Sequence, residues 1–172
     1  MTLPALVTLT VWGIPRRQIP HALGRMATQR GAVRDYPGVT FAKLLGTGSG
    51  RTFTVRDYDL THWALLACWD SPQAASAFER SRSSRSWNSA CVERLRIELI
   101  PLASRGQWSG QQPFGPDALP ASSAAQSGTV AAITRARLRA STARTFWRAV
   151  PDVSKSLSRS PGLMLSLGIG EA

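Results

Sequence analysis

Apolar and polar positions alternate along the first half of the chain in two rhythms, one of strands and one of helices. Residues 6–14, LVTLTVWGI, place threonine between leucine and valine, and this period of two predicts a strand with one buried face. Over residues 19–33 the apolar side chains recur at helical spacing, and Pro20 suits the first turn of a helix. Pro37-Gly38 then predicts the end of that helix.

The same succession continues to about residue 102. Residues 39–45 predict a second strand, and residues 62–69, HWALLACW, predict a third that is apolar enough to be central and covered. Ser71 and Pro72 suit the N-cap and first position of a second helix, and residues 94–102 alternate charged and apolar side chains as a fourth strand would. The order β-α-β-β-α-β predicts an α+β fold of the ferredoxin-like kind. Its helices would cover one face of an antiparallel sheet, leaving the other free to pair with a second copy.

The pattern then restarts after a break. Residues 104–127 are rich in Gly, Pro, Ser and Gln, which predicts a linker after a first unit at residues 5–103. Residues 128–172 begin a second unit, with a strand at 128–140, a helix at 141–162 and a strand at 163–170. At an offset of 124, Gly170 falls on Gly46, so we predict a duplicated unit. The second copy stops after its second strand, and we expect it to be incomplete.

The net charge of the chain limits which classes of partner it can attract. The net charge is +11, and 19 of the 21 basic residues are arginine, an enrichment that a GC-rich coding sequence would also produce. The functional interpretation is attraction to an anionic lipid surface, a nucleic acid or an acidic protein. Because the sequence holds no dense basic run and no nucleic-acid motif, we expect no nucleic acid partner.

The cysteines and the apolar runs bear on localisation. Cys68 and Cys91 do not form a CxxC pair, and the N-terminal apolar stretch lacks the charge order and cleavage site of a signal peptide. No run of about 18 apolar residues is present. We therefore expect reduced thiols, a cytoplasmic chain and no spanning helix.

The stretch LLGTGSGRTF, residues 44–53, superficially resembles a phosphate-binding loop. Only three residues separate Gly46 from Gly50, and Arg51 stands where a P-loop has lysine. The residues that follow have no helical periodicity, so no helix N-terminus would face an anion. The spacing favours a connection after a strand.

Few side chains suit catalysis. His21 and His62 lie far apart in sequence, and we find no paired-histidine metal motif and no nucleophile elbow. Strand alternation places His62 and Cys68 on one face of the third strand, opposite Trp63 and Trp69. The tryptophans suit a core, or the wall of a cavity for a long apolar or planar ligand. No catalytic residue is assigned from these patterns.

Several segments resemble one known family, the spheroidene monooxygenases, also called acyclic carotenoid 2-ketolases. The resemblance covers nearly the whole chain. Its most distinctive segments are SRGQWSGQQPF at residues 104–114 and PGLMLSLGIGE at residues 161–171. The glycine loop at residues 44–53, together with Lys43, is similar to the family pattern KLxGTGxG. This similarity favours a site-forming or structural loop over a phosphate-binding loop.

The resemblance implies a dimeric α+β barrel architecture built from ferredoxin-like units. It also implies a monooxygenase that acts on a carotenoid with O₂, an external electron donor such as ferredoxin, and haem. A homo-oligomer with a basic surface at the membrane periphery would fit such a substrate. His62 and His21 are candidate haem contacts because they are the sole imidazoles, and no other metal is expected. The candidate substrate contacts are Gly46, Gly48, Trp63, Trp69 and Trp108.

Other interpretations stay open. Members of the family continue past GIGE with a further strand, helix and strand, so this chain resembles a C-terminally truncated member. A non-catalytic module that binds haem or an apolar ligand, or that mediates dimerisation, is one alternative, and an inactive fragment is another. A basic nucleic-acid-binding protein is the third, and its binding would weaken steeply with salt.

Overall fold

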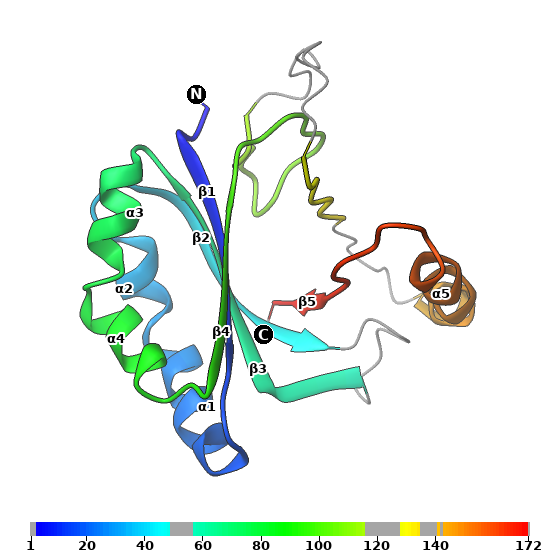
Figure 1. Cartoon of the computed structure of the whole chain (residues 1–172), viewed down its shortest axis with the longest axis horizontal. Helices are drawn as coiled ribbons and strands as arrows, with labels where there is room; N and C mark the ends of the chain where they lie inside the picture. Colours follow the sequence, from blue (N-terminus) through cyan, green and yellow to red (C-terminus); the bar gives the residue numbers. More distant parts are fainter. Residues whose placement is uncertain (1–2, 49–56, 116–127, 135–140, 142, 172) are drawn as a thin grey trace.

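The computed structural model describes residues 3–48, 57–115, 128–134, 141 and 143–171. Strands and helices alternate along the first hundred residues, as the apolar pattern requires (Figure 1). In chain order the elements are β1 (Leu6–Gly13), the 3₁₀ turn η1 (Arg16–Gln18), α1 (Ile19–Thr28), α2 (Arg30–Arg34), β2 (Val39–Gly48), β3 (Tyr58–Trp69), α3 (Pro72–Phe78), α4 (Arg82–Asn88), β4 (Glu93–Leu99), α5 (Ala143–Ser158) and β5 (Gly168–Gly170).

The strands form one antiparallel sheet in the order β4-β1-β3-β2-β5. Helices α1 to α4 form a layer on one face of this sheet, and α5 lies on the other side (Figure 1). The predicted ferredoxin-like α+β fold is therefore confirmed. The nearly all-apolar third strand lies in the middle, between β1 and β2.

The two predicted helices are each divided. In the second, Ser71 caps α3 by accepting a hydrogen bond from the Ala74 amide at 3.3 Å, and Ser81 caps α4 by accepting from the Ser84 amide at 3.1 Å. A serine side chain competes for backbone amides, so the serine-rich stretch ends one short helix and starts the next. β3 also begins at Tyr58, four residues before the predicted start.

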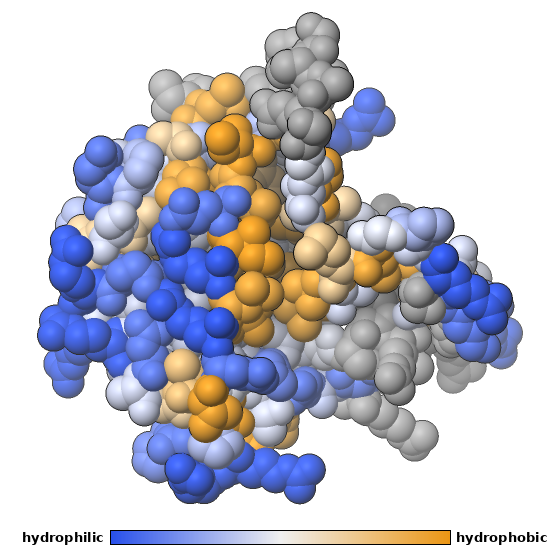
Figure 2. Space-filling view, in the orientation of Figure 1, coloured by the Kyte–Doolittle hydropathy of each residue, from blue (hydrophilic) through white to orange (hydrophobic). Residues whose placement is uncertain are grey.

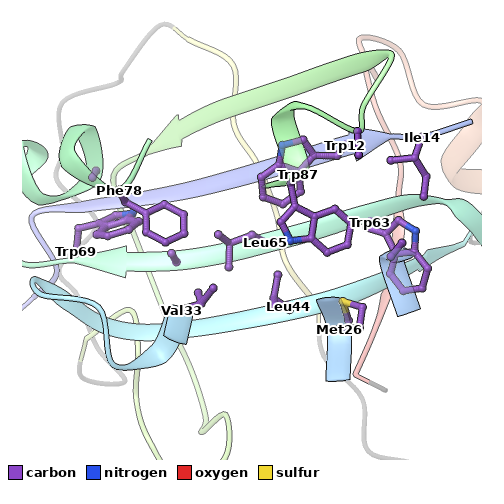
Figure 3. Close-up of a cluster of buried hydrophobic side chains, with 14 of the residues drawn as sticks. Trp12, Ile14, Met26, Val33, Leu44, Trp63, Leu65, Trp69, Phe78 and Trp87 are labelled. Atoms are coloured by element: carbon purple, nitrogen blue, oxygen red, sulfur yellow. The ribbon is translucent and has the colours of Figure 1, made fainter. Parts of the chain in front are cut away.

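A tryptophan-rich core fills the space between the sheet and the helix layer (Figure 3). Trp12 of β1 stacks on Trp87 of α4 with ring centroids 5.3 Å apart, and Trp63 of β3 lies 6.2 Å from Trp87. The Trp12 indole donates to Asn88 Oδ1 at 2.7 Å, so its polar atom is satisfied inside the core. Stacked rings at this spacing add to the apolar area they bury, and they hold α4 on the sheet.

A second, smaller core lies on the helix-free face of the sheet. Trp108 is buried there against Phe41 of β2, with ring centroids 5.5 Å apart. Its indole nitrogen donates to Glu171, and Lys43 reaches both Glu171, at 3.3 Å, and Ser109 Oγ, at 2.7 Å. Part of the segment expected to be a linker is thus held against the sheet. The two most distinctive family-like segments meet at the hydrogen bond from Trp108 to Glu171, and Lys43 contacts both segments.

The second half of the chain is less regular than the pattern suggested. Helix α5 lies inside the predicted helix, but residues 128–134 have no strand, and only β5 remains of the predicted strand at 163–170. β5 pairs with the end of β2 through Gly46 and Gly170. The repeat and the domain boundaries stay predictions.

Candidate functional site

A row of three residues crosses the sheet near one end of the helix-free face. Gly13 of β1 lies between His62 of β3 and Glu93 of β4, and it pairs with both. Because glycine has no side chain, the imidazole and the carboxylate meet above it, with His62 Nε2 2.6 Å from Glu93 Oε1. A Cβ atom at Gly13 would overlap the Glu93 side chain. The site therefore depends on glycine at this position.

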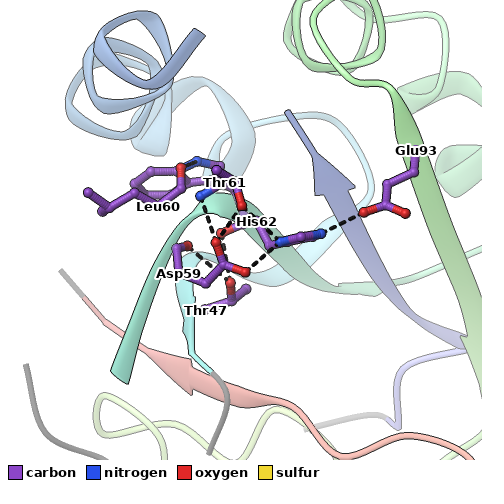
Figure 4. A network of polar contacts seen from close by, with 7 residues as sticks. Thr47, Asp59, Leu60, Thr61, His62 and Glu93 are labelled. Carbon is purple, nitrogen blue, oxygen red and sulfur yellow. Dashed lines mark hydrogen bonds and ion pairs between the residues drawn. The ribbon is translucent and has the colours of Figure 1, made fainter. Parts of the chain in front are cut away.

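The second ring nitrogen of His62 contacts a second carboxylate. Nδ1 lies 2.6 Å from Asp59 Oδ2, while Asp59 Oδ1 accepts from the Thr61 amide at 2.8 Å and from its hydroxyl at 2.5 Å (Figure 4). Thr47 of β2 donates its hydroxyl to the His62 carbonyl at 2.8 Å. These contacts hold the imidazole between two carboxylates on a bulged part of β3.

The arrangement favours a doubly protonated imidazole. Partial burial alone would lower the pKa of His62, but the hydrogen bonds to Glu93 and Asp59 outweigh it, and the pKa is raised. Burial would raise the pKa of Asp59, whereas the hydrogen bonds from Thr61 and His62 lower it overall. Ionised carboxylates only accept hydrogen bonds, so both ring nitrogens must donate.

The three charged side chains lie at the margin of an open groove of about 720 Å³. Apolar side chains of Val11, Leu95, Leu165 and Leu167 form part of its wall, and Figure 2 shows apolar surface gathered along the middle of the molecule. The lining residues are Val11, Gly13, Thr47, Gly48, Asp57, Tyr58, Asp59, His62, Glu93, Arg94, Leu95, Leu165, Ser166 and Leu167. An apolar wall with a few convergent polar groups is typical of a small-molecule site.

The groove also stands out by its charge. It carries the carboxylates of Asp57, Asp59 and Glu93, three of the ten acidic residues in a chain of net charge +11. Arg94 is its one guanidinium among the described residues, and that group pairs with Glu79 on the helix side of the sheet. The imidazolium of His62 beside the carboxylates of Asp59 and Glu93 gives the described lining an acidic character in a basic protein.

The predicted site residues are dispersed by the fold. His62 and Gly48 line the groove, whereas His21 is exposed on α1 in the helix layer. Trp63 and Trp69 are 3% and 1% exposed in the core on the helix side, out of reach of a ligand in the groove.

The two remaining candidates lie on β2 or against it. Gly46 pairs with β5, and Trp108 is buried against the strand through Phe41. Their predicted contact with substrate stays a prediction, as does that of the two core tryptophans, and the packing of Trp63 and Trp69 gives it no support.

His62 has no bare ring nitrogen to offer to an iron. A histidine ligand needs a bare ring nitrogen, and both nitrogens of His62 are engaged with carboxylates. Cys68 is fully buried, and burial raises the pKa of its thiol to about 12, so a thiolate is disfavoured. Across the described ranges no cluster of His, Cys, Asp and Glu could hold a metal ion. The haem prediction stays a prediction, and we derive no step through haem.

Sequence reasoning missed Gly13, Asp59 and Glu93. A signal for two of them was present, because the predicted strand order places the end of the first strand beside the starts of the third and fourth. Gly13, His62 and Glu93 then fall in one row. Asp59 could not be found this way, since the bulge that turns it toward His62 interrupts the alternation of β3.

Fold and site together define a ferredoxin-like α+β protein with a partly apolar groove on its helix-free face. The chain is 32% identical over 154 residues to the spheroidene monooxygenase of Rhodobacter capsulatus, covering 89% of this chain and 63% of that protein. It is 30% identical over 150 residues to that of Cereibacter sphaeroides (87% and 45%) and 36% identical over 137 residues to that of Rubrivivax gelatinosus (79% and 51%). The resemblance to the spheroidene monooxygenases is confirmed. The chain spans between about half and just under two thirds of these relatives' lengths.

No family model matches the chain. Among solved structures, an antibiotic biosynthesis monooxygenase from Nitrosomonas europaea is 13% identical, with a TM-score of 0.43 over 55% of this chain and 95% of that one. A heme-degrader from Mycobacterium tuberculosis is 18% identical, with a TM-score of 0.41 over 59% and 99%. These likenesses are too distant to carry a conclusion about function. No described helix is long and apolar enough to cross a bilayer.

Proposed function

We propose that the chain acts as a monooxygenase on a long apolar substrate, with a carotenoid as the first candidate, using O₂ and an external electron donor. The observation that carries this proposal is the 30–36% identity to three proteins named spheroidene monooxygenase over 79–89% of the chain. The inventory of described residues agrees, because it provides apolar area and acid–base groups.

The groove supports the substrate class. A polyene offers no polar groups along its length, so its binding depends on apolar area removed from water, at about 25 cal/mol per Å². Leu95 and Leu165 are 43% and 50% exposed at the groove, which leaves them surface to bury against a ligand. The charged side chains of His62 and Glu93, on either side of Gly13, would then lie beside the bound polyene.

The helix layer supports an acidic electron donor. Residues 15–38 and 70–92 hold eight arginines and three acidic residues, and seven of those arginines are exposed. A surface of one sign accelerates association with a partner of the other sign. This layer faces away from the groove (Figure 1), so donor and substrate would approach from opposite sides of the sheet. The exposed arginines are Arg16, Arg17, Arg30, Arg34, Arg80, Arg82 and Arg85.

The test is product formation by the purified chain. Spheroidene in detergent micelles, isotopically heavy O₂ and an NADPH-reduced acidic ferredoxin would be supplied, with haem added in a parallel series. Mass spectrometry should find one heavy oxygen atom in the product. Binding of the carotenoid without product would favour the non-catalytic ligand-binding module. If the chain neither binds the carotenoid nor forms product, the proposal is overturned.

A matched pair of variants places the substrate. Leu95→Asp puts a charge on the groove wall, whereas Leu23→Asp changes a leucine of similar exposure, 49%, on α1. Losing the apolar contact of one leucine costs about 1.5–3 kcal/mol, so Leu95→Asp should weaken carotenoid binding roughly ten- to hundredfold. Leu23→Asp should leave it unchanged. Equal affinities for the two variants would place the substrate elsewhere.

A further inference from the structure

The imidazole of His62 bridges two carboxylates that differ in their access to water. Glu93 has a side chain 66% exposed, while that of Asp59 is 41% exposed and is oriented by Thr61. We propose that Glu93, His62 and Asp59 form a proton relay from bulk water to the groove. This inference rests on the proposed function, because it assigns the protons that the oxygenation consumes.

The geometry provides both transfers. Each ring nitrogen lies 2.6 Å from one carboxylate oxygen, within the distance for proton transfer along a hydrogen bond. The Thr61 amide and hydroxyl both bind Asp59 Oδ1, which leaves Oδ2 for the imidazole. Because Gly13 has no side chain, nothing on β1 separates the imidazole from Glu93.

The surrounding charges suit a group that gathers protons. Asp59 of β3, Asp57 directly before that strand and Glu93 of β4 line the groove, while the Arg94 guanidinium pairs with Glu79 on the helix side of the sheet. The groove residues of β1, of β2 and of the segment 165–167 carry no charge. The carboxylates of Asp59 and Glu93 raise the local proton concentration beside His62 in a protein of positive net charge, which otherwise repels cations.

The chemistry of the proposed reaction requires such a supply. Insertion of one oxygen atom into a C–H bond breaks the O–O bond, and the second oxygen leaves as water. That water takes two protons from solvent, while the donor protein supplies two electrons. In the relay, the imidazolium passes its Nδ1 proton to the Asp59 carboxylate, which transfers that proton to the reacting oxygen and is ionised again. The neutral ring then turns its bare nitrogen toward Glu93, whose carboxylate takes a proton from bulk water and passes it to the ring. Two such cycles supply both protons.

The experiment compares three variants in the product assay. Glu93→Gln and His62→Gln keep hydrogen-bonding groups but cannot pass a proton, and general acid–base steps contribute about 10²- to 10⁴-fold. We expect product formation to fall at least tenfold in both, more steeply at high pH, with carotenoid affinity unchanged. The control is Glu98→Gln on the same strand, an exposed carboxylate that pairs with Arg96 and is absent from the groove.

Two further readouts separate a relay from a structural role. Added imidazole should restore part of the rate of His62→Gln, and the solvent isotope effect should grow in Glu93→Gln. If the wild-type chain forms product and both variants match its rate and its isotope effect, the relay alone is overturned. A wild-type chain that forms no product overturns the proposed function, and the relay with it.

Discussion

Gly46 and Gly170 are paired across β2 and β5 in antiparallel register, and they are separated by the offset of 124 at which the two halves of the sequence align. The neighbouring pairs step away from it in opposite directions, with Thr47 opposite Ile169 and Gly48 opposite Gly168. In an antiparallel pair of equivalent strands related by a two-fold axis, only the residue on the axis faces its own equivalent, and Gly46 would be that residue. The duplicated unit stays a prediction, and this pairing is the position at which two equivalent strands would meet.

The glycines of the loop have unequal roles, which two variants can separate. A Cβ at Gly48 would lie 2.6 Å from the Asp57 carbonyl oxygen, whereas the nearest atom to one at Gly46 is 3.9 Å away. Because a backbone oxygen cannot move aside cheaply, Gly48→Ala should lower the free energy of unfolding by about 1–3 kcal/mol. Gly46→Ala should change it little. Urea unfolding measures both, and equal losses would contradict a purely steric requirement at Gly48.

Gly13 should matter to the site more than to the fold. A Cβ at Gly13 would overlap the Glu93 side chain, which is exposed and can swing away. We expect Gly13→Ala to separate Glu93 from His62 and to lower the pKa of the imidazole, as measured by NMR titration.

Gly24 provides the control for this substitution. It lies in α1 with nothing within 4 Å of its Cβ position, so Gly24→Ala should add about 0.5–1 kcal/mol of stability and leave the titration of His62 unchanged. A His62 titration that is the same in Gly13→Ala as in the wild type would show that the gap at Gly13 is not what joins the two side chains.

The sequence predicted the fold better than the site, for physical reasons. The strand order follows from the succession of strand and helix segments, and the covered faces follow from the alternating positions of β1 and the nearly all-apolar run of β3. The site instead depends on a missing side chain at Gly13 and on a bulge that turns Asp59 inward. Neither has a periodic signature, since both arise only when distant strands are placed side by side. Trp63 and Trp69 were predicted to contact substrate, but they lie in the core on the helix side. A large apolar ring predicts burial without indicating which face of the sheet buries it.

Trp108 should stabilise the joined family-like segments. Its ring packs on Phe41, and its indole donates to Glu171. Trp108→Phe keeps a ring but leaves the carboxylate without this donor, and losing a hydrogen bond to a charged group costs about 1.5–3 kcal/mol. We expect a matching fall in the free energy of unfolding by urea. Glu171→Gln retains an acceptor and should cost less, so a larger loss in Glu171→Gln than in Trp108→Phe would contradict this account.

Haem binding, where it occurs, should not depend on His62 or His21. Both nitrogens of His62 are engaged, and His21 is exposed on the helix layer. The double variant His62→Ala/His21→Ala should therefore give the same visible absorption spectrum with added haem as the wild type. Loss of the main haem band in the variant would identify an imidazole ligand. If the single variant His62→Ala also lost the band, a contact with Asp59 or Glu93 would have to break on binding.

The stability contributed by His62 should depend on pH in a defined direction. The pKa of His62 is raised in the folded chain, so its contribution is complete below about pH 6.5, the ordinary value, and is lost as pH rises through the folded pKa. Asp59 behaves in the opposite sense, because its pKa is lowered. Its contribution is present above about pH 3.9 and is lost as pH falls through its folded pKa.

Both effects define one pH window. The difference in unfolding free energy between wild type and His62→Gln should be largest between these limits, near pH 5–6, and should shrink as pH rises through the raised pKa of His62. The side chains are a third or more exposed, so solvent screens the pairs and the difference should be modest. Urea unfolding of both chains across this range measures it. A difference that grows with rising pH would mean that His62 is neutral in the folded chain, and the doubly donating imidazole would be wrong.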